Sequence, residues 1–139
     1  MTLDVSDVIK DTVELIQIDS QNPGPRESEC SVWLEERLRR TGLDMTRQSV
    51  ATGRDNLIVS VGGRGSSPRL VLLAHMDTVP IGEGWTQPPL EGKIVDGRLY
   101  GRGSCDMKAG VALALNLIES VDRVGGVGGD VVLCLTCDE

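Results

Sequence analysis

The chain has 139 residues, 40% hydrophobic and 25% charged, which fits one soluble globular domain and excludes a disordered or fibrous protein. Lysine and arginine total 14 against 21 aspartates and glutamates, and this net charge of −7 argues against nucleic-acid partners, which bind basic surfaces. The longest apolar stretch, 111–118, is far shorter than the ~20 residues of a membrane span, and the acidic start at Asp4 does not resemble a secretion signal.

Two helices open the predicted domain. Apolar residues recur at helical spacing over residues 4–18, so we expect an amphipathic helix there, which the Pro-Gly-Pro tract at 23–25 ends. Residues 27–40 begin with acidic side chains, end with basic ones and are followed by Gly42. This charge order suits a helix dipole and predicts a second helix.

Three strands follow in the prediction. Residues 43–50 and 56–61 have the composition of short strands, and a flexible glycine-rich and serine-rich loop covers 62–67. Residues 70–74 are continuously apolar, which is typical of a strand covered on both faces. This strand places His75 at its carboxyl end.

The last third of the chain completes an α/β pattern. Two short apolar runs on either side of Asp96-Gly97 predict a hairpin. We expect a buried helix over 107–121 and a further strand over 131–135. Because strands alternate with helices, the sequence predicts an α/β fold with a mostly parallel central sheet flanked by helices.

Acidic and imidazole side chains gather where ligands bind in such folds, beyond the carboxyl ends of strands. His75 and Asp77 follow one strand, two positions apart, so extended backbone would project both to the same side. Asp106 lies between a glycine-rich turn and a helix, and Glu139 follows another strand. A carboxylate beside a metal-bound imidazole commonly fixes its orientation, which is the duty that Asp77 could perform.

Each of these residues also has an ordinary structural interpretation. His75 could be an isolated histidine in a loop, and Asp106 could be the N-cap of the following helix. Asp138 and Glu139 could be a solvated strand terminus. A glutamate beside a metal-bound water could instead take its proton and pass it to a leaving amine, as in amide hydrolysis.

Other candidate motifs are weaker. Cys134 and Cys137 are three residues apart on a strand, so their side chains would point to opposite faces instead of to one metal ion. The Gly101-x-Gly103 turn is similar to a dinucleotide-binding turn, but Asp106 occupies the third glycine position and would repel pyrophosphate. The carboxylate next to Cys105 disfavours its thiolate, so we expect a small packing residue there.

Three blocks in order give the strongest indication. The tracts AHMDTVP at 74–80, GEGWTQPPL at 82–90 and GRLYGRGSCDMKAG at 97–110 resemble two signature blocks of one hydrolase family, and TCDE at 136–139 resembles the start of a third. The family comprises acetylornithine deacetylase, succinyl-diaminopimelate desuccinylase and carboxypeptidase G, which are co-catalytic zinc hydrolases. Leu90 and Ala109 are small departures from its usual pattern.

The resemblance implies roles for individual residues. His75 would bind one metal ion, Asp106 would bridge two, Asp77 would orient the histidine, and Glu139 would be the general base. The ions would be zinc, with cobalt as a substitute, and the fold would be that of a zinc-exopeptidase catalytic domain. The family also suggests a cis peptide between Asp106 and Met107.

The same resemblance predicts an incomplete catalytic domain. Residues 1–139 would be its N-terminal part, without the later metal ligands and without the lid domain that serves dimerisation and substrate recognition, so the 139-residue chain itself would be inactive. The full-length protein would be a cytoplasmic amide hydrolase or exopeptidase acting on a small N-acyl amino acid or peptide. The scattered cysteines agree with a reducing compartment. The rival hypotheses are a non-catalytic α/β domain that binds a small molecule and a nucleotide-binding module.

Overall fold

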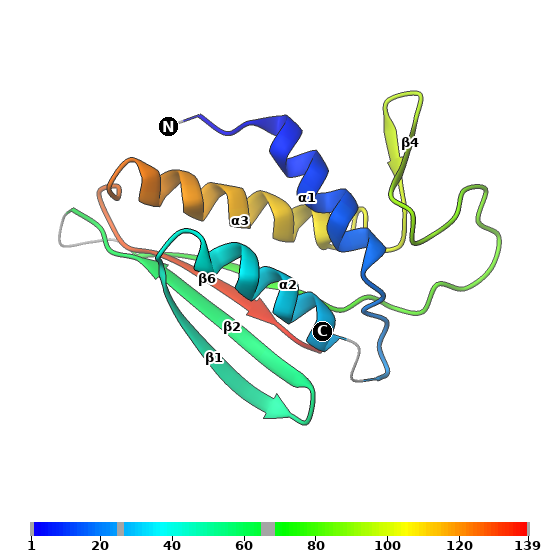
Figure 1. The fold of residues 1–139 in the computed structure, drawn as a ribbon, viewed down its shortest axis with the longest axis horizontal. Helices are drawn as coiled ribbons and strands as arrows, with labels where there is room; N and C mark the ends of the chain where they lie inside the picture. The colour runs from blue at the N-terminus through cyan, green and yellow to red at the C-terminus, as the bar shows by residue number, and fades with distance from the viewer. Residues whose placement is uncertain (1, 25–26, 65–68, 139) are drawn as a thin grey trace.

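The structure is a computed structural model that describes residues 2–24, 27–64 and 69–138. Every predicted helix and strand is confirmed, with small displacements of the ends (Figure 1). The helices are α1 Val5–Gln17, α2 Glu27–Arg39 and α3 Lys108–Arg123. The strands are β1 Asp44–Ala51, β2 Arg54–Val61, β3 Leu70–His75, β4 Lys93–Val95, β5 Arg98–Tyr100 and β6 Val131–Thr136.

Local chemistry explains several of these ends. The side chain of Asp4 caps α1 by accepting a hydrogen bond from the backbone nitrogen of Ser6 at 2.8 Å. The β4–β5 hairpin turns through Asp96 and Gly97, both with positive φ, which is the backbone that a two-residue turn of this handedness requires. Asn and Asp tolerate this conformation better than other side chains, and glycine adopts it freely.

The main sheet has the order β1-β2-β6-β3. Only β3 and β6 run parallel, whereas β1 pairs antiparallel with β2 and β2 pairs antiparallel with β6. The α/β class is therefore confirmed, but the sheet is mixed instead of mostly parallel. The short connection between β1 and β2 leaves no room for a crossover helix, so these two strands form a hairpin and must be antiparallel.

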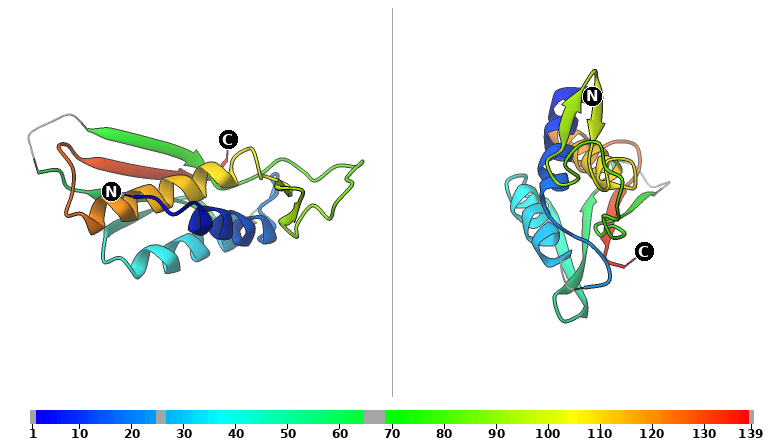
Figure 2. Two further views of the ribbon diagram at one scale, coloured as in Figure 1. Left: turned by 90° about the horizontal axis from the view of Figure 1, so that it is seen from above. Right: turned by 90° about the vertical axis from the view of Figure 1, so that its right-hand side faces the viewer.

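All three helices lie on one face of this sheet (Figure 2). Helix α3 packs against β2, β3 and β6, α2 packs against β2, and α1 lies along α3. The core consists of the helix residues that face the sheet and the alternate strand residues that face the helices: Leu15, Leu34, Val111, Leu115, Ile118, Leu57, Val59, Leu133 and Leu135. Arg37 of α2 joins the three helices through ion pairs with Asp11 of α1 and Glu119 of α3.

The expectation that the apolar run 70–74 is covered on both faces is wrong for the structure described. Strand β3 has one neighbouring strand and forms an edge of the sheet. Leu73 is 67% exposed and Val71 is 54% exposed on the face away from the helices. In the described residues, no helix combines the length and apolarity of a membrane span.

Candidate metal site at the carboxyl edge of the sheet

His75 is the last residue of β3, and it lies at the end of the sheet where the parallel strands β3 and β6 both finish. It pairs with Thr136 across the two strands, and the next residue continues the pairing through a hydrogen bond from Met76 N to Thr136 O of 2.8 Å. The side chain of His75 is only 9% exposed. The ring is therefore held in place where a parallel α/β sheet presents its ligand-binding groups.

The ring of His75 lies between two aspartates. Its Nδ1 is 3.0 Å from the backbone oxygen of Asp77 and 3.5 Å from Asp77 Oδ1, and its Nε2 is 3.1 Å from Asp106 Oδ1. A carbonyl oxygen only accepts hydrogen bonds, so Nδ1 carries a proton and the Nε2 of a neutral ring presents its lone pair to Asp106. Two acceptors facing each other require a proton or a metal cation between them.

This spacing fits a metal ion. Zinc bonded tetrahedrally to a histidine nitrogen and a carboxylate oxygen would hold these two atoms about 3.4 Å apart, from usual bond lengths. The separation of 3.1 Å between His75 Nε2 and Asp106 Oδ1 is close to that value. Nitrogen and oxygen are also the donor types that zinc accepts.

Asp77 is buried, with 3% of its surface exposed. Its carboxylate contacts His75 through Oδ1, and its Oδ2 accepts a hydrogen bond from Asn22 Nδ2 at 3.2 Å. The expected proximity of His75 and Asp77 is confirmed. The backbone oxygen of Asp77 makes the shorter contact with the ring, so it contributes to orienting the histidine beside the carboxylate.

Asp106 is not the N-cap of α3. The capping residue is Met107, which makes no side-chain capping bond, and the side chain of Asp106 is 75% exposed apart from its contact with His75. The peptide between Asp106 and Met107 is cis, as the family resemblance suggests. The carboxylate of Asp106 faces the imidazole and makes no capping bond to the amide groups of the helix.

Lys108 fixes the turn that carries Asp106, a function that the sequence alone did not indicate. Its ammonium group donates hydrogen bonds of 2.7 Å to the backbone oxygens of Leu15 and Ile18 at the end of α1. The side chain is almost fully buried, and this burial lowers its pKa. The one sequence feature that could have indicated this role is a lysine on the inner face of a predicted apolar helix.

The glycines of the preceding turn are packing residues. A Cβ on Gly103, where φ is +82°, would lie 2.8 Å from a Thr78 side-chain carbon, and one on Gly101 would lie 2.5 Å from Ile16. The turn is therefore filled by the protein's own side chains. This close packing argues against the nucleotide-binding interpretation, which needs open backbone amides around a phosphate.

The other predicted candidates lie partly outside the site. Glu139 falls outside the described residues, whereas Asp138 just before it is described. Cys134 and Cys137 differ in burial, and the Cys137 thiol contacts Asn56 Oδ1 at 3.4 Å. Within residues 2–24, 27–64 and 69–138, no group of three or more histidine, cysteine or acidic side chains is arranged to hold a metal ion. His75 and Asp106 thus provide a pair of candidate ligands.

A second group of polar residues adjoins this pair and was not predicted. Asn22 Nδ2 donates to both Asp77 Oδ2 and Asp138 Oδ1, and Arg54 donates to Asp138 and Glu27. The hydrogen bond from Asn22 and the contact with Arg54 lower the pKa of Asp138. These residues come from separated parts of the chain, so no local motif marks them.

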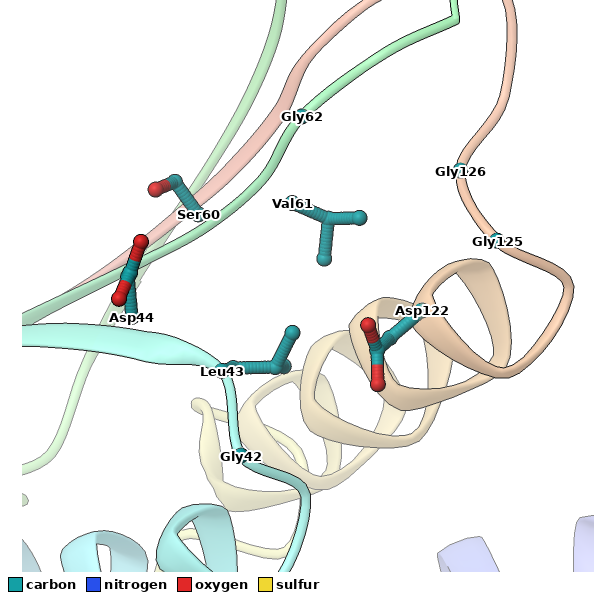
Figure 3. Close-up of a pocket in the computed structure, with 9 residues that line it drawn as sticks. All are labelled: Gly42, Leu43, Asp44, Ser60, Val61, Gly62, Asp122, Gly125 and Gly126. Carbon is teal, nitrogen blue, oxygen red and sulfur yellow. The ribbon is translucent and has the colours of Figure 1, made fainter.

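Two hollows differ in their relation to these residues. A depression of about 480 Å³ bordered by Asn22, Pro23, Asp77 and Val79 adjoins the candidate metal pair. The hollow in Figure 3 lies at the other end of the strands, where the start of β1 and the end of β2 meet the end of α3. Asp44 and Asp122 are the charged residues that line it, and His75 is not among its lining residues. The depression beside Asp77 is therefore the candidate for ligand binding.

Comparison with known proteins shows which family the chain resembles. Residues 71–139 match the sequence profile of peptidase family M20/M25/M40. A succinyl-diaminopimelate desuccinylase of Rhodospirillum centenum is 43% identical over 88 residues, which are 61% of this chain and 22% of the relative. The enzyme of that name from Cereibacter sphaeroides is 35% identical over 130 residues, which are 92% of this chain and 33% of the relative.

The fold also matches solved structures. An M20 family metallo-carboxypeptidase from Sulfolobus solfataricus, Sso-CP2, superposes with a TM-score of 0.81 at 19% identity, over 94% of this chain and 30% of that one. The chain spans 22% and 33% of the length of the two desuccinylases. The similarity thus covers most of this chain but a minor part of each relative.

Proposed function

The chain belongs to peptidase family M20/M25/M40 through residues 71–139, and from this we propose that its full-length protein is a zinc-dependent amide hydrolase. Its substrate would be a small N-acyl amino acid or a peptide. The succinyl-diaminopimelate desuccinylases that it resembles favour an acylated amino acid, and with it a function in amino-acid metabolism. The depression of about 480 Å³ beside Asp77 has the volume of a small-molecule site.

One observation carries this proposal. His75 Nδ1 lies 3.0 Å from the backbone oxygen of Asp77, and Nε2 lies 3.1 Å from Asp106 Oδ1, so a neutral ring that donates from Nδ1 presents the lone pair of Nε2 to this carboxylate. A cation between these two atoms would satisfy both. His75 and Asp106 would be metal ligands, Asp106 would be shared by two zinc ions, and cobalt would be a replacement metal.

The remaining residues would direct the reaction. When bound, zinc supplies a Lewis acid and lowers the pKa of a water molecule. Asp77 holds the imidazole of His75 in one tautomer and one orientation. Glu139, placed by its sequence directly after Asp138, would accept the proton of the attacking water and return it to the leaving amine.

We further propose how this chain relates to the whole protein. Residues 1–139 would be the N-terminal part of the catalytic domain, with the other metal ligands and a lid domain supplied by the rest of the polypeptide. The lid domain would bind the substrate carboxylate and form a homodimer. We place the protein in the cytoplasm, without a nucleic-acid or membrane partner.

Activity of the full-length protein tests this function. With added zinc or cobalt, we expect hydrolysis of at least one member of a panel of N-succinyl, N-acetyl and dipeptide substrates, and loss of activity on chelation. His75→Ala and Asp106→Asn should abolish hydrolysis and lower the bound zinc measured by atomic absorption. Asp77→Asn should reduce activity roughly 10- to 100-fold, as expected for a residue that supports a ligand.

The neighbouring exposed thiol provides a matched control. Cys105→Ser changes the residue beside Asp106 without altering a proposed ligand, so its activity and zinc content should equal those of the wild type. A wild-type protein that hydrolyses no substrate of the panel with either metal would disprove the proposed activity. Full activity of His75→Ala would disprove the site.

A further inference from the structure

We propose that Asn22 and Arg54 are positioning residues, which hold Asp77 and Asp138 in one fixed arrangement at the carboxyl ends of β3 and β6. This inference rests on the proposed function, because Asp138 directly precedes the proposed base. We call Asn22, Arg54 and their anchor Glu27 the carboxylate clamp. Its members come from three different parts of the fold.

Asn22 joins the ends of the two parallel strands. Its Nδ2 lies 3.2 Å from Asp77 Oδ2 and 2.6 Å from Asp138 Oδ1, so a single amide group contacts both carboxylates. An amide nitrogen has two hydrogens, which can serve these two acceptors separately. Asn22 therefore links the residue that orients His75 to the residue before Glu139.

The backbone around Asn22 is itself held against the end of β3. Asn22 N donates to Thr78 O at 2.7 Å, and Thr78 N donates to Ser20 O at 2.9 Å. The hydroxyl of Ser20 donates to Met76 O at 2.9 Å. The amide of Asn22 is thus carried by a segment that follows the strand end, which fixes where the side chain can reach.

Arg54 holds Asp138 from the other side. From the first position of β2, its Nη2 donates to Asp138 Oδ1 at 2.9 Å and to Glu27 Oε1 at 2.6 Å, and its Nε lies 3.2 Å from the same Glu27 oxygen. Glu27 is fully buried at the start of α2. A buried carboxylate needs a cationic partner, so Glu27 fixes the guanidinium that reaches Asp138.

The arrangement also bears on the backbone of Asp138. Its φ is +64°, in the left-handed region that most side chains avoid, although aspartate tolerates it better than most. Persistence of such backbone requires surrounding contacts that enforce it, and the contacts here are those from Asn22 and Arg54. They restrain the chain at the position directly before the proposed base.

The carboxylates of Asp77 and Asp138 also require hydrogen-bond donors nearby. Asp77 and Asp138 both approach one amide group, so two carboxylates lie close together and would repel each other without nearby donors. Asn22 and Arg54 supply those donors to Asp138. Its pKa is lowered accordingly, which agrees with an ionised carboxylate held by hydrogen bonds.

Steady-state kinetics of the full-length zinc enzyme test the clamp. Asn22→Ala and Asp138→Ala should each lower kcat roughly 10- to 100-fold, since small displacements of catalytic groups cost that much, with little change in KM or zinc content. Asp138→Asn retains an oxygen acceptor for both donors and should recover most of the activity. Arg54→Lys retains the positive charge without the planar fork and should be intermediate.

The control is an ion pair of the same chemistry at the other end of the sheet. Arg69 Nη2 lies 3.1 Å from Asp130 Oδ2 and both side chains are substantially exposed. Arg69→Met should leave kcat and KM unchanged. Unchanged kcat in both Asn22→Ala and Asp138→Ala, or failure of Asp138→Asn to exceed Asp138→Ala, would overturn the inference.

A second measurement keeps this test separate from the proposed function. Thermal unfolding of the full-length Asn22→Ala, Asp138→Ala and double variants should be non-additive, because the two residues share a contact. Additive shifts in Tm would overturn the clamp whatever the activity. An inactive wild type with non-additive shifts would instead refute the hydrolase proposal and leave the clamp's contact established.

Discussion

At the scale of single residues, the cysteines show how burial changes chemistry. Cys30 of α2 is buried in the core, and desolvation raises the pKa of its thiol to about 12. Cys105, beside the candidate ligand Asp106, is exposed. A thiol reacts as its thiolate and only where reagents can reach it. Cys30 is both inaccessible and poorly ionised, whereas Cys105 is accessible.

This difference predicts a pH-dependent stability. Between pH 9 and 12 the Cys30 thiol of the unfolded chain ionises while the folded one stays protonated, so the unfolded state binds fewer protons and stability falls as pH rises. From pH 8 to pH 10 the loss from this residue should be about 1.4 kcal/mol. Urea unfolding of the wild type and Cys30→Ala should show it.

The comparison at two pH values separates ionisation from packing. Cys30→Ala leaves a cavity that lowers stability equally at pH 8 and pH 10, whereas the alkaline loss should be smaller in the variant. Other groups that titrate in this range affect both proteins alike. An identical difference between the two proteins at both pH values would refute the raised pKa.

The sequence indicated some residues of the candidate site and not others. Sequence order brought attention to His75, Asp77 and Asp106 because each follows a strand or turn signal, and the structure brings these three together. Asn22, Arg54 and Lys108 were missed. Their contacts join positions far apart in the chain, and no local pattern of residue types records such a meeting.

At the scale of elements, the two loops at the amino-terminal edge of β3 and β6 depend on close backbone contact. A Cβ added at Gly63 would lie 2.3 Å from the backbone carbon of Gly129, a distance that real side chains do not reach. Gly63 N also donates to Asp130 Oδ1 at 3.0 Å. The loop after β2 and the loop before β6 are therefore packed together at this point.

Gly63→Ala should separate these loops and destabilise the fold by about 1–3 kcal/mol, the usual cost of overpacking. The adjacent Gly62 offers a matched control, because a Cβ there meets nothing within 4 Å. Urea unfolding should show a clear loss for Gly63→Ala and little change for Gly62→Ala. Equal stability of the two variants would contradict the close contact.

Elements also differ in how far sequence could predict them. The hairpin at Asp96-Gly97 and the helices were found because turn chemistry and apolar spacing are local. The burial of β3 on both faces was predicted wrongly, since an apolar run does not reveal whether helices cover one face of its sheet or both, and the three helices here lie on one face. Strand order and pairing direction depend on tertiary packing.

At the scale of the whole molecule, the described residues provide only two of the proposed metal ligands. His75 Nε2 and Asp106 Oδ1 face each other at 3.1 Å, and the described part of the chain contains no three-residue cluster for a metal ion. Structural zinc sites use four protein ligands and catalytic sites use three. A pair of ligands should therefore bind zinc weakly.

Isothermal titration of the 139-residue chain with zinc checks this expectation. We expect affinity weaker than nanomolar, and a further decrease in His75→Ala, because removal of the imidazole leaves one of the two ligands. Arg69→Met, at the opposite edge, serves as the control and should not alter the titration. Nanomolar affinity of the wild-type chain would mean that the metal shell is more complete than His75 and Asp106.

The sequence by itself determined the elements, the α/β class, the family and the candidate site residues His75, Asp77 and Asp106, because periodicity, turn residues and ordered motifs are properties of neighbouring positions. Tertiary structure alone decided that β2 joins β6, that Lys108 holds the end of α1, and that Asn22 and Arg54 meet at Asp138. These contacts depend on which distant surfaces pack together. Packing is a cooperative property of the whole fold that no single stretch of sequence contains.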